Sequence, residues 1–73
     1  MNSKSIGKRL RNLRGDKSIR TVAEDLGLAH ATISMYENGE RVPKDEIKIK
    51  IAKYYNSSVE EIFFADEVHD TCT

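Results

Sequence analysis

Only one cysteine occurs in the 73 residues, and no hydrophobic run is long enough to cross a membrane. A single thiol, Cys72, cannot form a disulfide within the chain. The opening segment, MNSKSIGKRL, also lacks the apolar stretch of a signal peptide. These absences argue against a disulfide-rich secreted protein and against a membrane protein, so we expect a cytoplasmic protein.

The residue groups that perform catalysis or hold a metal are lacking too. The sequence has no glycine-rich phosphate loop and no Ser-His-Asp order, and Ser34 near His30 has no third, orienting group. His69 and Cys72 do not supply a metal-ligand set at a useful spacing. A chain this short does not easily form a deep substrate cleft. We therefore predict a binding module rather than an enzyme, with no metal, cofactor or small-molecule effector.

The formal net charge is zero, but the charges are segregated along the chain. Residues 1–20 carry 7 basic residues and 1 acidic residue, a net charge of +6. Residues 57–73 carry 5 acidic residues and no Lys or Arg, and the middle has 5 basic against 6 acidic residues. A basic surface is thus compatible with a neutral chain, although a solvated helix face would give the same count.

Hydrophobic spacing predicts helices separated by tight turns within one small domain. Ile6, Leu10 and Leu13 recur at helical intervals and predict a first helix over residues 4–14, which Gly15 ends.

The next two helices are predicted from their end signals. Ser18 is a good N-cap for a second, short helix, and Gly27 is placed for a left-handed C-terminal turn. The inward residues of this helix are Val22, Ala23 and Leu26. A third helix over residues 29–37 stops at Asn38 and Gly39, which both tolerate positive φ.

The segment after Pro43 fits two patterns. Ile47, Ile49 and Ile51 alternate with lysines as in a half-buried strand, but a lone strand would have no partner in a helical chain. Because Ile47, Ile51, Ala52 and Tyr55 also follow a helical period, we predict a helix over residues 44–55. A capping box formed by Ser58 and Glu61 then opens a last short helix with Val59, Ile62 and Phe63 inward.

The third helix has an unusual outward face. At 100° per residue, Tyr36 and Glu37 fall near the core side with Ile33, whereas Ala31 and Met35 point away. A solubilising face would carry Lys and Glu instead. Short side chains let a helix backbone enter a groove closely, and Ala or Met can contact thymine methyl groups. This face is therefore a candidate DNA-reading surface.

The arrangement resembles the Cro/C1-type helix-turn-helix family of phage Cro and repressor proteins, also called the XRE family. The likeness is carried by VAEDLGLAHATISMYENGERVP, residues 22–43, and the match extends over residues 5–64. The coinciding positions are Ala23, Gly27, Ile33, Ser34, Glu37, Asn38, Gly39 and Pro43. The resemblance implies an all-α, five-helix, lambda-repressor-like domain that regulates transcription by binding double-stranded DNA at specific sequences.

The resemblance also implies roles for individual residues. The third helix would lie in the major groove and contact bases, through His30, Ala31, Thr32, Ser34 and Met35. Phosphates would be bound at the start of the second helix and in the turn after the third, by Ser18, Ile19, Asn38, Arg41 and Lys44. Arg14 and Glu37 match a family ion pair that sets how the third helix is presented. The resemblance further implies that the protein acts as a repressor and binds a palindromic operator as a homodimer.

Three departures from the family pattern affect these roles. Ile19 stands where many members have Gln, so its side chain cannot hydrogen-bond a phosphate. Ala29 replaces the usual Ser or Thr cap, which weakens the start of the third helix by about 1 kcal/mol. The turn GDKS before the second helix is about two residues shorter than usual.

We expect the chain to divide into a DNA-binding domain, residues 1–64, and an acidic flexible tail, residues 65–73. Phe63 and Phe64 are adjacent, so one can be in the core while the other is exposed, and Phe64 is a candidate dimer contact. The alternative function is a protein-binding module, such as an antitoxin or anti-repressor partner, that uses the tail or the Phe64 region. Binding to duplex DNA distinguishes the two.

Overall fold

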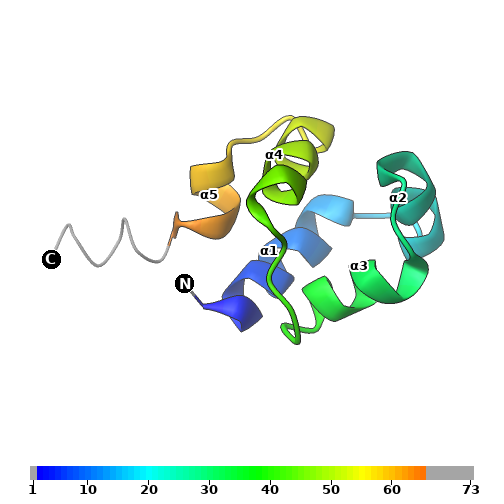
Figure 1. The fold of residues 1–73 in the computed structure, drawn as a ribbon, viewed down its shortest axis with the longest axis horizontal. Coiled ribbons are helices and arrows are strands. Elements are labelled where there is room, and N and C mark those ends of the chain that lie inside the picture. The colour runs from blue at the N-terminus through cyan, green and yellow to red at the C-terminus, as the bar shows by residue number, and fades with distance from the viewer. Residues whose placement is uncertain (1, 66–73) are drawn as a thin grey trace, which may run out of the picture.

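Five helices make up the described part of the chain, residues 2–65, in a computed structural model (Figure 1). They are α1 (Ser3–Arg14), α2 (Ile19–Leu26), α3 (His30–Glu37), α4 (Asp45–Tyr54) and α5 (Val59–Phe63). No strand occurs between residues 2 and 65. Figure 1 places α2 and α3 at one end of the molecule and α5 at the other, with α1 running between them. The predicted all-α, five-helix architecture is confirmed.

The helix ends follow local side-chain chemistry. Ser18 caps α2, because its Oγ accepts a hydrogen bond from the Thr21 N–H at 3.0 Å. Gly27 ends α2 in the left-handed conformation, with φ of 70°. Ser58 caps α5 in the same way through the Glu61 N–H at 3.0 Å. Its hydroxyl donates to Glu61 Oε1 at 3.2 Å, so the predicted cap forms with the side chains bonded to each other.

Residues 45–54 form a helix, which settles the choice between strand and helix in favour of the prediction. Ile51 and Ala52 are buried and Ile47 is partly buried, as the helical period requires. Ile49, the residue that completes the alternating pattern, is 49% exposed. The strand-like alternation is thus a coincidence of spacing, since its members face different sides of α4.

One core lies between the helices, and every helix contributes to it. Its buried apolar members are Ile6, Leu10, Val22, Ala23, Leu26, Ile33, Tyr36, Ile51, Ala52, Ile62 and Phe63. Leu13 does not belong to this core, although its spacing placed it on the apolar stripe of α1, and it is 39% exposed. Leu13 instead lines a shallow surface groove between α1 and α5, together with Ile62 and Glu61, because α5 does not cover it.

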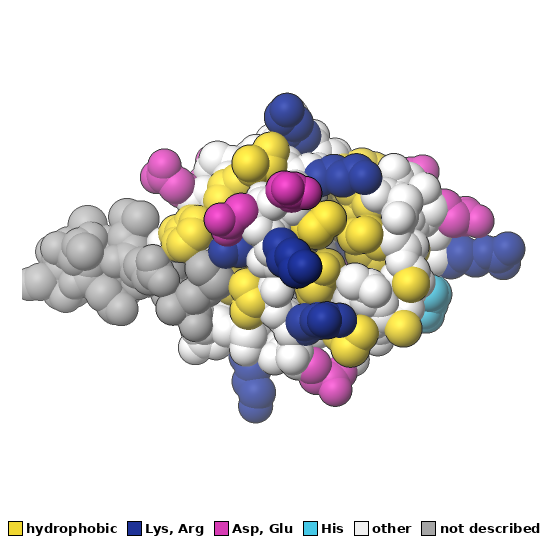
Figure 2. All heavy atoms as spheres, in the orientation of Figure 1, with side chains coloured by type: hydrophobic (Ala, Val, Ile, Leu, Met, Phe, Trp, Pro, Cys, Tyr) yellow, Lys and Arg dark blue, Asp and Glu magenta, His cyan; other side chains and the backbone are white. Residues whose placement is uncertain are grey.

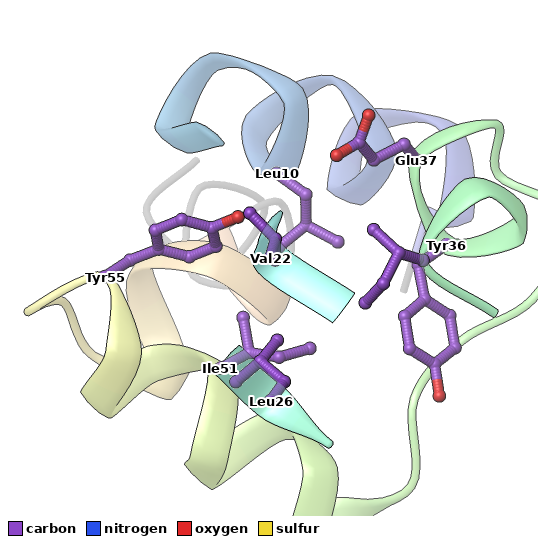
Figure 3. Close-up of a pocket in the computed structure, with 8 residues that line it drawn as sticks. Leu10, Val22, Leu26, Tyr36, Glu37, Ile51 and Tyr55 are labelled. Atoms are coloured by element: carbon purple, nitrogen blue, oxygen red, sulfur yellow. The ribbon is translucent and has the colours of Figure 1, made fainter. Parts of the chain in front are cut away.

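A small gap remains inside the core (Figure 3). It is lined by the ring of Tyr55 and by the side chains of Leu10, Val22 and Ile51, among others. Its volume of about 10 Å³ is that of a single water-sized sphere. In Figure 3 the ring of Tyr55 reaches toward Leu10 and Val22. Burial, aided by the nearby Glu37 carboxylate, raises the pKa of Tyr55 to about 12. The gap is too small for an organic ligand.

Lys48 is a buried charged residue that joins α4 to α5. Its side chain is 8% exposed, and its Nζ lies 3.5 Å from Asp45 Oδ1. The ammonium group stands 5.0 Å from the ring centroid of Phe64 and 5.9 Å from that of Phe63. Phe64 is accordingly half-buried, whereas Phe63 is fully in the core.

The expected acidic tail falls outside the described residues except for Ala65. Within the described part, no helix has the length and apolar character needed to span a bilayer.

Candidate nucleic-acid interface

The predicted base-reading residues all lie on α3. His30 and Ala31 are exposed, and Thr32, Ser34 and Met35 are partly exposed. Met35 differs from its sequence-based placement, since it is half-buried rather than directed fully into solvent. Ala29 precedes the helix without a side-chain capping bond. The accessible face of α3 therefore presents short and neutral side chains, with one imidazole at its first residue.

The start of α2 offers backbone donors. The first N–H groups of a helix have no intrahelical partner, and the Ser18 hydroxyl satisfies that of Thr21. The structure gives the Ile19 and Arg20 N–H groups no acceptor within residues 2–65. The Ile19 side chain packs against the core. Ile19 can therefore contact an anion only through its backbone.

The segment between α3 and α4 carries two exposed cations, Arg41 and Lys44, and one exposed carboxylate, Glu40. Asn38, Arg41 and Lys44 are all exposed. Figure 2 shows Lys and Arg side chains over this segment, with hydrophobic side chains between them. Val42, at 37% exposure, is among the apolar residues that reach the surface. Exposed cations in the segment after α3, together with the short and largely neutral side chains on the accessible face of α3, suit a nucleic-acid duplex, which has phosphates beside a groove.

Arg14 and Glu37 form a two-pronged ion pair between α1 and α3. Arg14 Nε donates to Glu37 Oε2 at 2.7 Å, and Arg14 Nη2 donates to Oε1 at 3.0 Å. The Glu37 side chain is 3% exposed and that of Arg14 is 18% exposed. The hydrogen bond to Glu37 raises the pKa of Arg14. Figure 3 shows the Glu37 carboxylate pointing toward α1.

Arg14 also reaches the turn before α2. Its Nη1 donates to the Lys17 carbonyl oxygen at 2.7 Å. One guanidinium group therefore bonds both the C-terminal end of α3 and the turn before α2, and it fixes their positions relative to each other. Both predicted DNA-contacting elements are positioned from α1.

Sequence reasoning did not identify Gly7 as a contact between α1 and α3. A Cβ atom at Gly7 would lie 2.2 Å from the Glu37 carbonyl oxygen and 2.9 Å from that of Tyr36. Only a residue without a side chain allows this approach of two backbones. The signal was available, because an isolated glycine inside a helical pattern usually has a packing reason.

A second missed network ties the turn before α2 to α4. Lys17 Nζ donates to the Tyr54 hydroxyl at 3.1 Å, and that hydroxyl donates to Asp25 Oδ2 at 2.5 Å. The hydrogen bond to Tyr54 raises the pKa of Lys17. These residues are distant in sequence and follow no motif, so the sequence contained no signal for their meeting.

Comparison with known proteins agrees with this geometry. The family model described as Helix-turn-helix matches residues 8–62. The "Uncharacterized HTH-type transcriptional regulator YvzC" of Bacillus subtilis (strain 168) is 34% identical over 56 residues, which cover 77% of this chain and 73% of that protein. No solved structure matches the chain significantly. The resemblance seen in residues 22–43 is confirmed, and the chain belongs to the Cro/C1-type (XRE) helix-turn-helix family of DNA-binding transcriptional regulators.

Proposed function

We propose that the protein is a sequence-specific repressor that binds a palindromic operator in double-stranded DNA as a homodimer. The observation that carries this proposal is the outward face of α3, whose side chains are short and largely neutral and which is followed in the chain by the exposed Arg41 and Lys44. A neutral, closely approachable helix suits the major groove, and cations at its end suit the phosphates beside that groove.

The proposed contacts are of two kinds, base contacts that select the sequence and phosphate contacts that hold the protein on the duplex. Bases are contacted by His30, Ala31, Thr32, Ser34 and Met35. Phosphates are contacted by Ser18, Asn38, Arg41 and Lys44 and by the Ile19 N–H, because the dipole at the start of α2 favours an anion. Arg14 and Glu37 orient α3 and touch no DNA.

A dimer is proposed because one recognition helix spans too few base pairs for tight binding. Two-fold symmetry in the protein then requires two-fold symmetry in the operator, with half-sites about one helical turn, roughly 34 Å, apart. Phe64 is the proposed dimer contact through the part of its ring that Lys48 and the core leave exposed.

Selection from random duplexes, followed by footprinting and titration, tests the proposal. We expect a symmetric footprint with two protomers per site. One protomer on an asymmetric footprint would refute the dimer. Binding with no specific site above a salt-sensitive background would instead favour a protein-binding module.

Loss of a base contact and loss of a phosphate contact should change DNA binding in different ways. Arg41→Ala should weaken binding to all sequences similarly and reduce the salt dependence by about one counterion, so that log K changes by about 0.9 less per log salt. Met35→Ala should leave that slope unchanged and alter preference at one or two base pairs per half-site, by about 1–3 kcal/mol.

Affinity for the selected operator and its single-base variants, measured at several salt concentrations, checks both variants. The assignment of the α3 face is wrong if Met35→Ala changes only the salt slope. It is equally wrong if Arg41→Ala relaxes base choice at constant slope.

A further inference from the structure

A chain of side-chain contacts runs from α1 to the face of α3. Arg11 Nη2 donates to Asn38 Oδ1 at 3.4 Å, and Asn38 Nδ2 donates to Ser34 Oγ at 3.4 Å. Arg11 Nε also lies 3.8 Å from Glu37 Oε1. We call these contacts the Arg11–Asn38–Ser34 relay. Arg11 lies on α1, which supports α3 from behind, whereas Ser34 lies on the face of α3 that is proposed to enter the major groove.

The relay has only one possible direction. A guanidinium group donates and cannot accept, so the Asn38 atom that meets Arg11 must be the amide oxygen. The Asn38 amide nitrogen therefore faces Ser34 and donates to its oxygen. Among residues 2–65, this is the only hydrogen bond in which the Ser34 side chain takes part. The Ser34 hydroxyl hydrogen remains available for an acceptor outside the protein.

We infer that Arg11 is a positioning residue that makes Ser34 a hydrogen-bond donor to the operator, so that Ser34 selects a base edge carrying an acceptor. A serine without such a relay donates or accepts freely and discriminates poorly between bases. The bond from Asn38 uses one of the two lone pairs of Ser34 Oγ and leaves its O–H free. Because an accepted hydrogen bond strengthens donation by the same hydroxyl, Ser34 favours purine N7, guanine O6 or thymine O4 over the amino groups of cytosine and adenine. This inference rests on the proposed function, since it requires α3 in the major groove.

The exposed position of Arg11 provides a competing explanation that can be tested. Its side chain is 61% exposed, so a phosphate contact would also account for any loss of affinity. A phosphate contact contributes to the salt dependence and not to base choice, whereas a relay contributes to base choice and not to the salt dependence.

The experiment compares Arg11→Ala, Ser34→Ala and the double variant on the selected operator and its single-base variants at several salt concentrations. Lys8→Ala is the matched control, because Lys8 is an exposed cation on the same helix whose side chain forms no hydrogen bond or ion pair with α3. We expect both single variants to lose about tenfold of discrimination at the same base pair of each half-site. The double variant should lose no more than Ser34→Ala alone, and the salt slope of Arg11→Ala should equal that of Lys8→Ala.

Asn38→Asp provides a second test that does not depend on removing Arg11. A carboxylate cannot donate to Ser34, so the Ser34 hydroxyl must donate to it, and the preference at that base pair should move toward an amino group. The added negative charge should lower affinity for all sequences, which leaves the ratio between sequences as the readout. Thermal unfolding midpoints of all variants verify that each is folded.

Several outcomes would overturn the inference. They are a lower salt slope for Arg11→Ala with unchanged base preference, additive losses in the double variant, or no loss of discrimination in Ser34→Ala. If the unaltered protein selects no duplex at all, the proposed function fails with it. If it selects an operator but the Arg11 and Ser34 variants behave independently, only the relay fails.

Discussion

Replacing Gly7 with alanine is expected to destabilise the fold by about 3 kcal/mol or more. The new methyl group would lie 2.2 Å from the Glu37 carbonyl oxygen and 2.8 Å from its carbonyl carbon. These are backbone atoms of α3, so no side-chain rotation relieves the clash, and α1 and α3 must separate. A domain of this length has about 4–11 kcal/mol in total, so the loss is large. Urea denaturation measures it.

The expected loss of stability is opposite in sign to the usual effect of a Gly-to-Ala substitution in a helix. In an exposed helix interior, alanine is favoured over glycine by about 1 kcal/mol. A stabilised Gly7→Ala variant would therefore show that the two backbones are not in tight contact. Gly27→Ala is the control, since it adds the same group at φ of 70° with only the Lys50 Nζ nearby at 3.8 Å. Its expected loss of about 1–2 kcal/mol reflects backbone conformation alone.

Arg14→Ala is expected to reduce both stability and operator affinity. Glu37 would remain with its side chain buried and its two-pronged partner removed. Truncating one member of a buried pair costs about 3 kcal/mol or more, which exceeds the net contribution of the intact pair. Operator affinity should fall without loss of a base contact, because α3 loosens and an unpaired carboxylate lies near the phosphates.

A double-mutant cycle with Glu37→Gln measures the coupling. We expect the double variant to lose clearly less than the two single losses together, and strict additivity would refute the pairing. Arg20→Ala serves as the comparison for a surface pair. Arg20 Nε lies 3.8 Å from Glu24 Oε2, with both side chains largely exposed. Arg20→Ala should therefore change the free energy of unfolding by less than about 1 kcal/mol.

Local chemistry made the helices predictable from sequence. Ser18 and Ser58 cap their helices, and Gly27 takes the left-handed turn assigned to it. Such signals act over three or four residues, so they need no tertiary context. The apolar period was equally informative for residues with a single possible inward face, such as Ile6, Ile33 and Ile51.

The family resemblance, rather than periodicity, brought Arg14 and Glu37 together as a pair 23 residues apart in sequence. Nothing in the spacing of either residue identifies its partner. The proposed phosphate and base contacts likewise came from position within the matching region, residues 5–64. The structure adds that Ile19 packs inward and that Phe64 is half-buried, which restricts how each can contact a partner.

The number and limits of the helices, most of the core and the face of α3 could be predicted from sequence, because they depend on interactions between near neighbours. Which helices approach closely, and which apolar residues stay uncovered, became clear from the packing of the helices. The contact of Gly7 with Glu37, the exposure of Leu13 and the burial of Lys48 against Phe63 and Phe64 depend on crossing geometry. So does the reach of Arg11 to Asn38. Periodicity specifies the face on which a residue lies, but the distance and rotation between two helices specify what that face meets.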